Sequence, residues 1–273
     1  MSMGERIAAP PAEWPSADTR RQLLFVIPAF NEEANLPILF DDLARASALL
    51  GEGSRIFIVD DGSTDETPAL VRAYDGPLPM ELVRLEVNQG PGAAFRRGFE
   101  TALACARPDA LIVTLESDAT SDIDALEAMV CEAGRGADVV LADWQMVGVS
   151  LHRRLLSAAA GWVVRRGLGL DATTVSSFFR VYRAATLREA SARFGDHLIR
   201  ERGFACKAEL LGKLASMQAN IVEVPVSLDW TRRSGESKMP VLRTMLCYWR
   251  MLFRQRAAGA EPIPSASEGV VGA

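Results

Sequence analysis

The sequence predicts an α/β fold built on a mostly parallel central sheet with helices on both faces. Short apolar runs alternate along the chain with longer amphipathic segments, as expected when each strand is followed by a crossover helix. The apolar runs are too continuous to leave one face of a strand in water, which favours a sheet covered on both sides.

The predicted strands and helices alternate between residues 22 and 142. Ser63 followed three residues later by Glu66 predicts a capping box at the start of the second helix. The strands are expected at 22–27, 55–60, 80–87, 110–115 and 137–142, and the helices at roughly 34–50, 64–74, 92–105 and 123–134.

Composition excludes several classes of protein. The chain has 273 residues, 49% hydrophobic and 24% charged, which is ordinary for a globular protein able to bury a full core. No apolar stretch reaches the ~18–20 residues that span a bilayer, and the start lacks a signal-peptide core, so we expect a cytoplasmic protein. The four cysteines show no metal-binding spacing, and two histidines make a histidine-based metal site or relay improbable.

A polar segment follows each of four predicted strands. The segments are "PAFNEE", "DDGSTD", "NQGPGAA" and "ESDATSD". The carboxyl ends of parallel strands meet at one edge of a sheet, and ligands bind there in open α/β folds. The four segments therefore predict a single site.

Two of these motifs carry a family resemblance. "VIPAFNEEANL" (26–36) and "IVDDGSTDETP" (58–68), in this order and spacing, resemble the amino-terminal half of family 2 glycosyltransferases with the GT-A fold. The likeness is closest to the dolichol-phosphate mannosyltransferase-like, or polyprenyl-phosphate glycosyltransferase, branch and covers about residues 22–256. It implies a pocket for a nucleotide-diphosphate sugar. The residues that would line it are Pro28, Phe30, Asn31, Glu32, Val59 and Asp61.

The third motif, "NQGPGAAFRRGF" (88–99), only superficially matches a dinucleotide fingerprint. Phe95 takes the place of the third glycine, so a Rossmann dehydrogenase is not favoured. The stretch instead resembles the family's "N-x-G-x-G-x-A" loop, in which Gly92 would let the backbone approach the sugar nucleotide.

The fourth motif holds the predicted metal site. The resemblance expects "DAD" where this chain has Glu116-Ser117-Asp118, and Thr120 follows as a further polar ligand. Asp118 would contact a Mg²⁺ or Mn²⁺ ion on the donor diphosphate and act in catalysis. Glu116, longer by one methylene, would serve through a water on the cation or through a ribose hydroxyl, with Ser117 in the same pocket.

The carboxyl-terminal half carries the resemblance to the branch. "SSFFRVYRA" (176–184) resembles "TSGFRAYRR", and "GFACKAELL" (203–211) resembles "GFEFQVELL". "IVEVPVSLDWTRRSGESK" (221–238) resembles "I-x-EVP-x-x-F-x-x-R-x-x-GxSK", in which Arg232 and Lys238 would close over a phosphate as catalytic cations. Departures include Phe178 for the glycine of the first motif, Thr174 for an acidic residue, and Asp143 for an arginine.

The predicted domain division follows these motifs. Residues 1–20 and 257–273 read as disordered tails, 21–238 as the GT-A domain, and 239–256 as a basic amphipathic helix.

Residues 231–256 hold seven basic residues and one acidic, and 151–170 hold four arginines and no acid, although the whole chain has a net charge of −5. Each segment could be a core-packed helix with a solvated side, or could bind the inner face of an anionic membrane. Nucleic acid is not expected as a partner, and oligomers stay open.

Together these features predict an inverting, metal-dependent glycosyltransferase whose acceptor is a polyprenyl phosphate. A hydroxyl acceptor would need a base, for which Asp122 and Glu209 are the candidates. Two other classes stay open: a non-catalytic nucleotide-sugar-binding protein with a degenerate metal motif, and a nucleotidyltransferase, although the glycine-rich phosphate loop of the latter is missing.

Overall fold

The computed structural model describes residues 20–144 and 177–226, which form a seven-stranded sheet with the strand order β3-β2-β1-β4-β6-β5-β7. The pairs β1–β2, β2–β3, β1–β4 and β5–β7 are parallel, whereas β6 is antiparallel to both of its neighbours. The strands are β1 Leu23–Ala29, β2 Arg55–Asp60, β3 Met80–Arg84, β4 Leu111–Thr114, β5 Val139–Trp144, β6 Arg180–Arg183 and β7 Ile221–Val226. The mostly parallel sheet is therefore confirmed.

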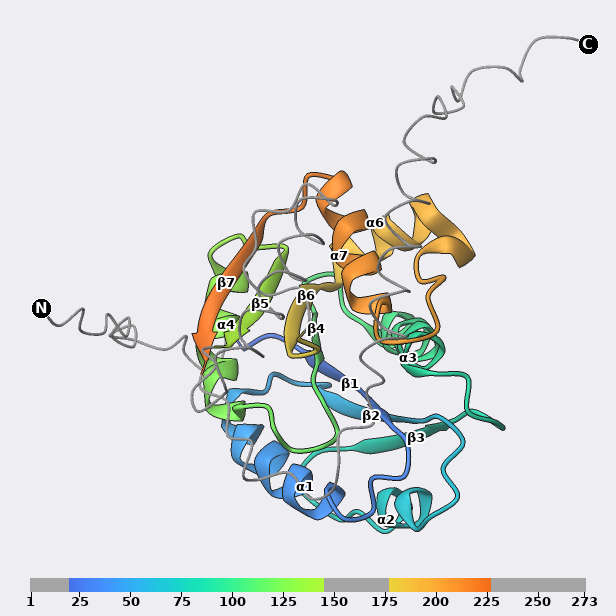
Figure 1. Cartoon of the computed structure of the whole chain (residues 1–273). Helices are drawn as coiled ribbons and strands as arrows, with labels where there is room; N and C mark the ends of the chain where they lie inside the picture. Colours follow the sequence, from blue (N-terminus) through green and yellow to red (C-terminus); the bar gives the residue numbers. More distant parts are fainter. Residues whose placement is uncertain (1–19, 145–176, 227–273) are drawn as a thin grey trace, which may run out of the picture.

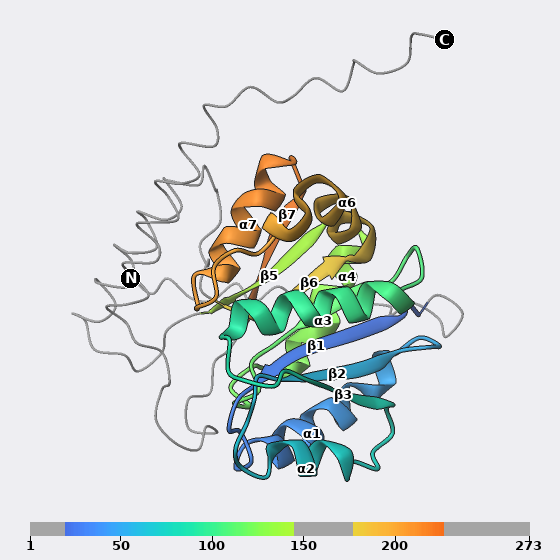
Figure 2. The same cartoon turned by 90° about the vertical axis from the view of Figure 1, so that its right-hand side faces the viewer.

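Helices cover both faces of the sheet, in agreement with the prediction. One apolar core lies between the sheet and α3, α6 and α7, and the other lies between the sheet and α1, α2 and α4. Figures 1 and 2 show these two layers, with α3 running across one face and α1 and α2 beneath the other. The helices are α1 Leu36–Arg45, α2 Thr67–Arg72, α3 Pro91–Cys105, α4 Leu126–Gly134, α6 Ala184–Phe194 and α7 Cys206–Ser216, with short 3₁₀ turns at Ala46–Leu49, Ile123–Ala125 and Gly195–His197.

Helix α3 lies close to the sheet because of a glycine. A Cβ at Gly98 would fall 2.3 Å from Val26 Cγ1 and 2.9 Å from Val59 Cγ2, so no larger residue fits without a shift. The helix begins at Pro91, which suits the first helical position because its missing N–H would have no partner there. The amino end of α3 is thereby placed over the carboxyl ends of β1 and β2.

The structure corrects one predicted start signal. Helix α2 begins at Thr67, and its N-cap residue, Glu66, makes no capping hydrogen bond with its side chain. Ser63 Oγ instead accepts from the backbone N–H of Asn31 at 2.9 Å, and the N–H of Glu66 donates to the Glu33 carboxylate at 2.9 Å. The predicted capping box is wrong, because these groups bond to the loop after β1 rather than to each other.

The boundaries of other elements differ by a few residues. Strand β3 ends at Arg84 rather than residue 87, and the first helix gives way to a 3₁₀ turn after Arg45. The tails, both basic segments and the predicted helix at 239–256 lie outside the described residues.

Candidate functional site

The candidate site begins with the loops after β1 and β2, which hydrogen bond to each other. Asn31 adopts a left-handed conformation (φ 53°), and its side-chain oxygen accepts from the N–H of Thr64 at 2.9 Å. The N–H of Glu32 donates to Thr67 Oγ1 at 2.8 Å. The polar residues of both motifs thus fix each other's backbone, which sets the shape of this edge of the sheet.

The predicted nucleotide-pocket residues lie at this edge. Pro28 pairs with Val59 between β1 and β2, and Phe30, partly exposed, follows directly after β1. The side chain of Val59 is fully buried under α3, so a base could meet only its backbone. The carboxylate of Glu32, also buried, accepts from the side chain of Asn35 at 2.6 Å.

Asp61 links the second loop to the third. Its two carboxylate oxygens accept from the N–H groups of Gln89 and Gly90, each at 2.8 Å. Burial raises the pKa of Asp61, while these two hydrogen bonds oppose the rise. Asp61 therefore sets the position of the loop after β3, whatever it contributes to a nucleotide.

The glycines of that loop face another part of the protein. The N–H of Gly92 donates to the carbonyl of Arg202 at 2.8 Å, and a Cβ on Gly92 would lie 1.9 Å from the carbonyl oxygen of Glu201. A Cβ on Gly90, which has a φ of +90°, would lie 2.4 Å from the Arg202 oxygen. The close backbone approach that the motif predicts exists, but the approaching partner in this structure is the segment before α7.

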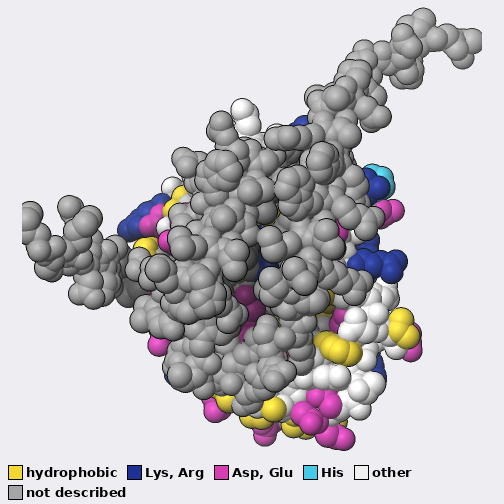
Figure 3. Space-filling model, in the orientation of Figure 1, with side chains coloured by type: hydrophobic (Ala, Val, Ile, Leu, Met, Phe, Trp, Pro, Cys, Tyr) yellow, Lys and Arg dark blue, Asp and Glu magenta, His cyan; other side chains and the backbone are white. Residues whose placement is uncertain are grey.

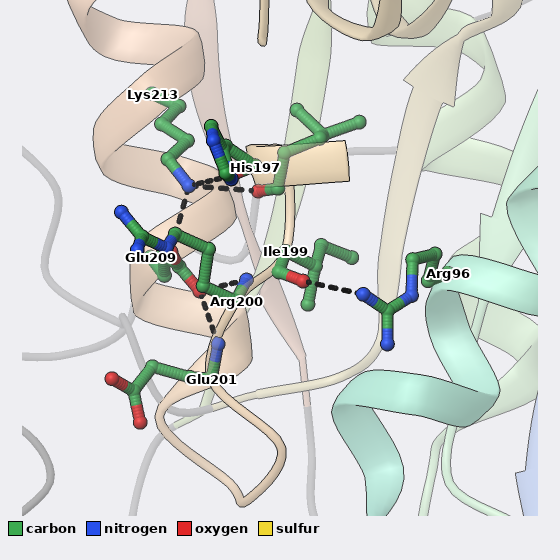
Figure 4. Close-up of polar contacts among 8 residues, drawn as sticks. Arg96, His197, Ile199, Arg200, Glu201, Glu209 and Lys213 are labelled. Atoms are coloured by element: carbon green, nitrogen blue, oxygen red, sulfur yellow. Dashed lines mark hydrogen bonds and ion pairs between the residues drawn. The ribbon is translucent and has the colours of Figure 1, made fainter. Parts of the chain in front are cut away.

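Glu209 holds that segment in place. One oxygen accepts from the N–H groups of Arg200 and Glu201 at 2.8 Å, and the other accepts from Lys213 Nζ at 2.7 Å (Figure 4). Asp122, the other candidate base, accepts from the N–H of Asp124 at 3.2 Å at the start of a 3₁₀ turn. Both carboxylates have a structural use, and a role of either one as a base stays a prediction.

The predicted metal triplet lies in the loop after β4. Asp118 Oδ1 accepts from Thr120 Oγ1 at 2.6 Å and from the Thr120 N–H at 3.3 Å, which closes a tight turn around Ala119 (φ 58°). Ser117 is buried beside it. The three predicted residues Asp118, Thr120 and Ser117 are thus brought together.

Glu116 turns toward strand β6. One of its oxygens accepts from the N–H of Phe178 at 2.9 Å, and the other accepts from Ser121 Oγ at 2.8 Å. Burial raises the pKa of Glu116, and the ammonium of Lys207 is the strongest influence that opposes the rise. A role of Glu116 toward a cation or a ribose stays a prediction.

Lys207 is the residue that sequence reasoning missed. It lies in the first turn of α7, is 8% exposed, and places its Nζ 3.9 Å from the centroid of the Phe178 ring. Burial lowers the pKa of Lys207 to about 8, although Glu116 and Asp118 both favour the charged form. The only signal in the sequence was the lysine of "GFACKAELL", which stands where the resembling motif has glutamine.

The comparisons with known proteins settle the family. The family model for glycosyl transferase family 2 matches residues 24–193. The chain belongs to glycosyltransferase family 2. It is 30% identical over 225 residues to the undecaprenyl-phosphate mannosyltransferase of Micrococcus luteus, covering 80% of this chain and 87% of that protein. It is 26% identical to the polyprenol monophosphomannose synthase of Mycolicibacterium smegmatis, covering 80% and 81%.

Solved structures confirm the GT-A fold for this glycosyltransferase. The glucosyl-3-phosphoglycerate synthase of Mycobacterium tuberculosis, crystallised with Mn²⁺ and uridine diphosphate, superposes with a TM-score of 0.63 at 19% identity. The match covers 93% of this chain and 85% of that one. At this identity the likeness speaks for the fold alone.

Among the described residues, a divalent cation would fit only if substrate phosphates completed its ligands. In residues 20–144 and 177–226, no group of three or more His, Cys, Asp or Glu side chains comes together that could hold a metal by itself. Mg²⁺ at phosphate-transfer sites is held by one or two carboxylates together with substrate phosphates. Asp118, partly exposed in the loop after β4, meets that requirement with Thr120 beside it.

Other predicted contacts lie beyond this part of the structure. Arg232 and Lys238 are outside the described residues, so their closure over a phosphate stays a prediction. Within the described part, no helix is both long and apolar enough to cross a membrane. On the face shown in Figure 3, acidic side chains gather over α2 at the lower edge of the molecule.

Proposed function

We propose that this glycosyltransferase moves a hexose, such as mannose, from a nucleoside-diphosphate sugar to a polyprenyl phosphate, with inversion at the anomeric carbon. The observation that carries the proposal is the convergence of four polar loops at the carboxyl edge of β1, β2, β3 and β4. Two relatives that align over most of their length are named for the transfer of mannose to such lipids.

The donor would lie across the loops after β1, β2 and β4. Phe30 would present a flat apolar wall to the base, while Asn31 and Glu32 follow at the edge of the same pocket. Asp61 would fix the loop after β3 beside this pocket through the backbone N–H groups of Gln89 and Gly90. These residues bind and orient the nucleotide, and the chemistry happens at the triplet.

Asp118 would be the carboxylate that meets the diphosphate. A divalent cation, Mg²⁺ or Mn²⁺, held there would neutralise the charge that develops on the leaving nucleoside diphosphate. Thr120 fixes the orientation of the Asp118 side chain by donating to it at 2.6 Å. Arg232 and Lys238 are proposed to add positive charge around the phosphates, as a bidentate fork and a point charge.

The acceptor explains why no strong base is needed. A phosphate oxygen is already anionic, so it can attack the anomeric carbon without losing a proton, and the bond to the diphosphate breaks on the opposite face. The structural use of Asp122 and Glu209 as hydrogen-bond acceptors supports this choice over a soluble hydroxyl acceptor. The lipid acceptor also favours a position at the inner face of the membrane, with the basic segments 151–170 and 240–256 as the contact.

The decisive experiment compares Asp118→Ala with a matched control. Purified protein is supplied with a nucleoside-diphosphate mannose, undecaprenyl phosphate and Mn²⁺, and the glycolipid and nucleoside diphosphate are quantified. Asp118→Ala should lower kcat/KM by about 10²–10³-fold, the scale of losing one electrostatic contact to the transition state. Asp124→Ala removes an exposed carboxylate six residues away and should leave kcat/KM unchanged.

Each of the other outcomes would change a different part of the proposed function. Near-normal turnover of Asp118→Ala at limiting Mn²⁺ would show that the cation is held elsewhere. Nucleotide binding without release of nucleoside diphosphate would favour the non-catalytic binding protein, and pyrophosphate as a product would favour a nucleotidyltransferase. Transfer to a soluble sugar hydroxyl, but not to the lipid, would replace the acceptor.

A further inference from the structure

Three residues that differ from the glycosyltransferase motifs which this sequence resembles lie close together in the folded protein. Glu116 stands where those motifs have aspartate, Phe178 where they have glycine, and Lys207 where they have glutamine. The three residues come from the loop after β4, the residues before β6 and the first turn of α7. We refer to them as the 116–178–207 cluster.

Direct contacts join the cluster. The N–H of Phe178 donates to Glu116 at 2.9 Å, and the ammonium of Lys207 lies 3.9 Å from the centroid of the Phe178 ring. The ring of Phe204 lies 5.6 Å from the same ammonium. An ammonium over aromatic faces is held by their quadrupoles, and more strongly where water is excluded. Phe178 therefore contacts both charged members of the cluster.

The backbone of Lys207 is fixed as well. Its carbonyl accepts from Arg180 Nη1 at 2.8 Å, and Arg180 is 1% exposed. Phe178, Lys207 and Cys206 also line one small hollow between α3, α7 and the sheet. In the resembling motif the position of Cys206 holds phenylalanine, so an aromatic ring is lost from α7 where Phe178 is gained before β6. Such an exchange keeps the volume of a packed region nearly constant.

The length of Glu116 fits its place in the cluster. An aspartate would end shorter by one carbon–carbon bond, about 1.5 Å, and could not reach the N–H of Phe178 with the same backbone. Because Glu116 also accepts from Ser121 at 2.8 Å, it ties both ends of the loop that contains Asp118 to the segment before β6. The longer side chain acts as a brace in this arrangement.

A buried ammonium near this brace is costly unless it has a use. Removing a charge from water destabilises the folded state, and a glutamine of similar length would avoid that penalty. Glu116 and Asp118 are the carboxylates that act on this ammonium, whereas Arg180 opposes it. A positive charge buried against the ring of Phe178 thus acts on the carboxylates that are proposed to face the donor diphosphate.

We propose that Lys207 is a positioning residue that acts as a resident counter-ion of the triplet. Its ammonium holds Glu116 as the brace between the β4 loop and β6, which leaves Asp118 as the carboxylate that meets the donor. The same charge repels a free divalent cation and attracts the diphosphate, so this chain needs more metal, and binds nucleotide more readily without metal, than a chain with glutamine there. The inference rests on the proposed donor site.

The first test measures binding rather than turnover. Uridine and guanosine diphosphate are titrated calorimetrically into the full-length protein and into Lys207→Gln, in EDTA and over a series of Mn²⁺ concentrations. Lys207→Gln should lower the Mn²⁺ concentration for half-maximal nucleotide binding about five-fold, because a like charge near the cation is gone. In EDTA the same variant should bind the nucleotides several-fold more weakly.

Arg97→Gln is the matched control. It removes one positive charge from an exposed part of α3, paired only at 3.7 Å with Glu100, and should shift neither quantity. Equal shifts in Lys207→Gln and Arg97→Gln would reduce the effect to net charge and overturn the proposal. Unchanged Mn²⁺ dependence in Lys207→Gln would overturn it as well.

A second test needs no nucleotide, so it separates failure of the inference from failure of the proposed function. The melting temperatures of Lys207→Gln, Glu116→Gln and the double variant are compared in metal-free buffer. Glutamine at 116 keeps an oxygen for the N–H of Phe178, and its NH₂ group can donate to Ser121 Oγ, so the charge is removed while both contacts can be kept. The change in melting temperature of the double variant should differ clearly from the sum of the two single changes, because removing both charges together leaves neither without its counter-charge. Additive changes would show that Lys207 does not hold Glu116.

Discussion

The two halves of the site are built in different ways. In the amino-terminal half, the loops after β1, β2 and β3 are joined by hydrogen bonds from backbone N–H groups to short polar side chains such as Asn31, Ser63 and Asp61. In the carboxyl-terminal half, buried long side chains such as Lys207 and Glu209 hold the structure. In the amino-terminal half the polar residues fix the shape of the loops, whereas in the carboxyl-terminal half charged side chains are buried inside the protein.

This difference bears on what each half can tolerate. A short side chain that accepts a hydrogen bond can be replaced at the cost of that bond, about 0.5–1.5 kcal/mol when it is neutral. A buried charge responds to pH and to its neighbours, because its solvation is lost. We therefore expect the amino-terminal half to respond locally to substitution and the carboxyl-terminal half to respond electrostatically.

The largest expected effect lies where the two halves meet. Gly92→Ala would place a Cβ 1.9 Å from the carbonyl oxygen of Glu201, a backbone atom that cannot turn away. The free energy of unfolding, measured in urea, should fall by about 3 kcal/mol, the upper part of the range for overpacking. Gly134→Ala is the control, because no atom beyond its chain neighbours and its own helix backbone lies within 4 Å of the added methyl group and its effect should stay within about 1 kcal/mol. Equal effects of the two variants would mean that the halves do not pack as described.

The second prediction tests the buried charge. Burial lowers the pKa of Lys207 to about 8 in the folded protein, from 10.5 when the side chain is free in water. Between these values the unfolded chain binds the proton more tightly, so the free energy of unfolding should rise with pH relative to Lys207→Gln. The rise from pH 7 to pH 10.5 should be about 2–3 kcal/mol, at 1.36 kcal/mol for each pH unit of the shift. If the free energies of unfolding of the wild-type protein and Lys207→Gln changed in parallel with pH, the Lys207 ammonium would have to be exposed to water.

Periodicity and motif spacing predict much of the fold, because most strands can be recognised from their own residues alone. Strands β1, β2, β4 and β5 are buried on both faces, so their continuous apolar runs identify them without knowledge of the partners. Strand β6 is four residues long and antiparallel to its neighbours, and its sequence "RVYR" carries two arginines, so no apolar run marks it.

The site divides along the same line. Asn31, Asp61 and Asp118 follow strands that the sequence reveals, so their position at one edge could be predicted. The partners of Gly92, Glu116 and Lys207 come from segments about 30 to 110 residues apart in the chain, and only the folded structure brings them together. The capping box failed for the same reason, because the acceptors that Ser63 and Glu33 provide serve a neighbouring loop.

The third prediction concerns Asp61. Asp61→Asn keeps one acceptor oxygen but turns an NH₂ group toward the N–H of Gln89 or Gly90, each of which now donates to the carboxylate at 2.8 Å. The loss of one charge-assisted bond should lower the free energy of unfolding by about 2 kcal/mol. Binding of nucleoside diphosphates should weaken in parallel, because the loop after β3 moves. Asp109→Asn, at an exposed site before β4, is the control. Weaker nucleotide binding at unchanged stability would instead mean that Asp61 touches the nucleotide directly.

The smallest expected effect tests the loop that replaces the capping box. In a capping box both partners satisfy helix N–H groups, so truncating either one costs about 1 kcal/mol. In this structure Ser63 accepts from the N–H of Asn31 at 2.9 Å, whereas the Glu66 side chain is exposed. Ser63→Ala should therefore lower the free energy of unfolding by about 1 kcal/mol, and Glu66→Ala by less than about 0.5 kcal/mol. Urea denaturation of the two variants side by side measures both values. Equal losses for the two variants would indicate that Ser63 and Glu66 form a capping box after all. The loops after β1 and β2 would then not be joined by Ser63, and the amino-terminal half would lose the feature that distinguishes it.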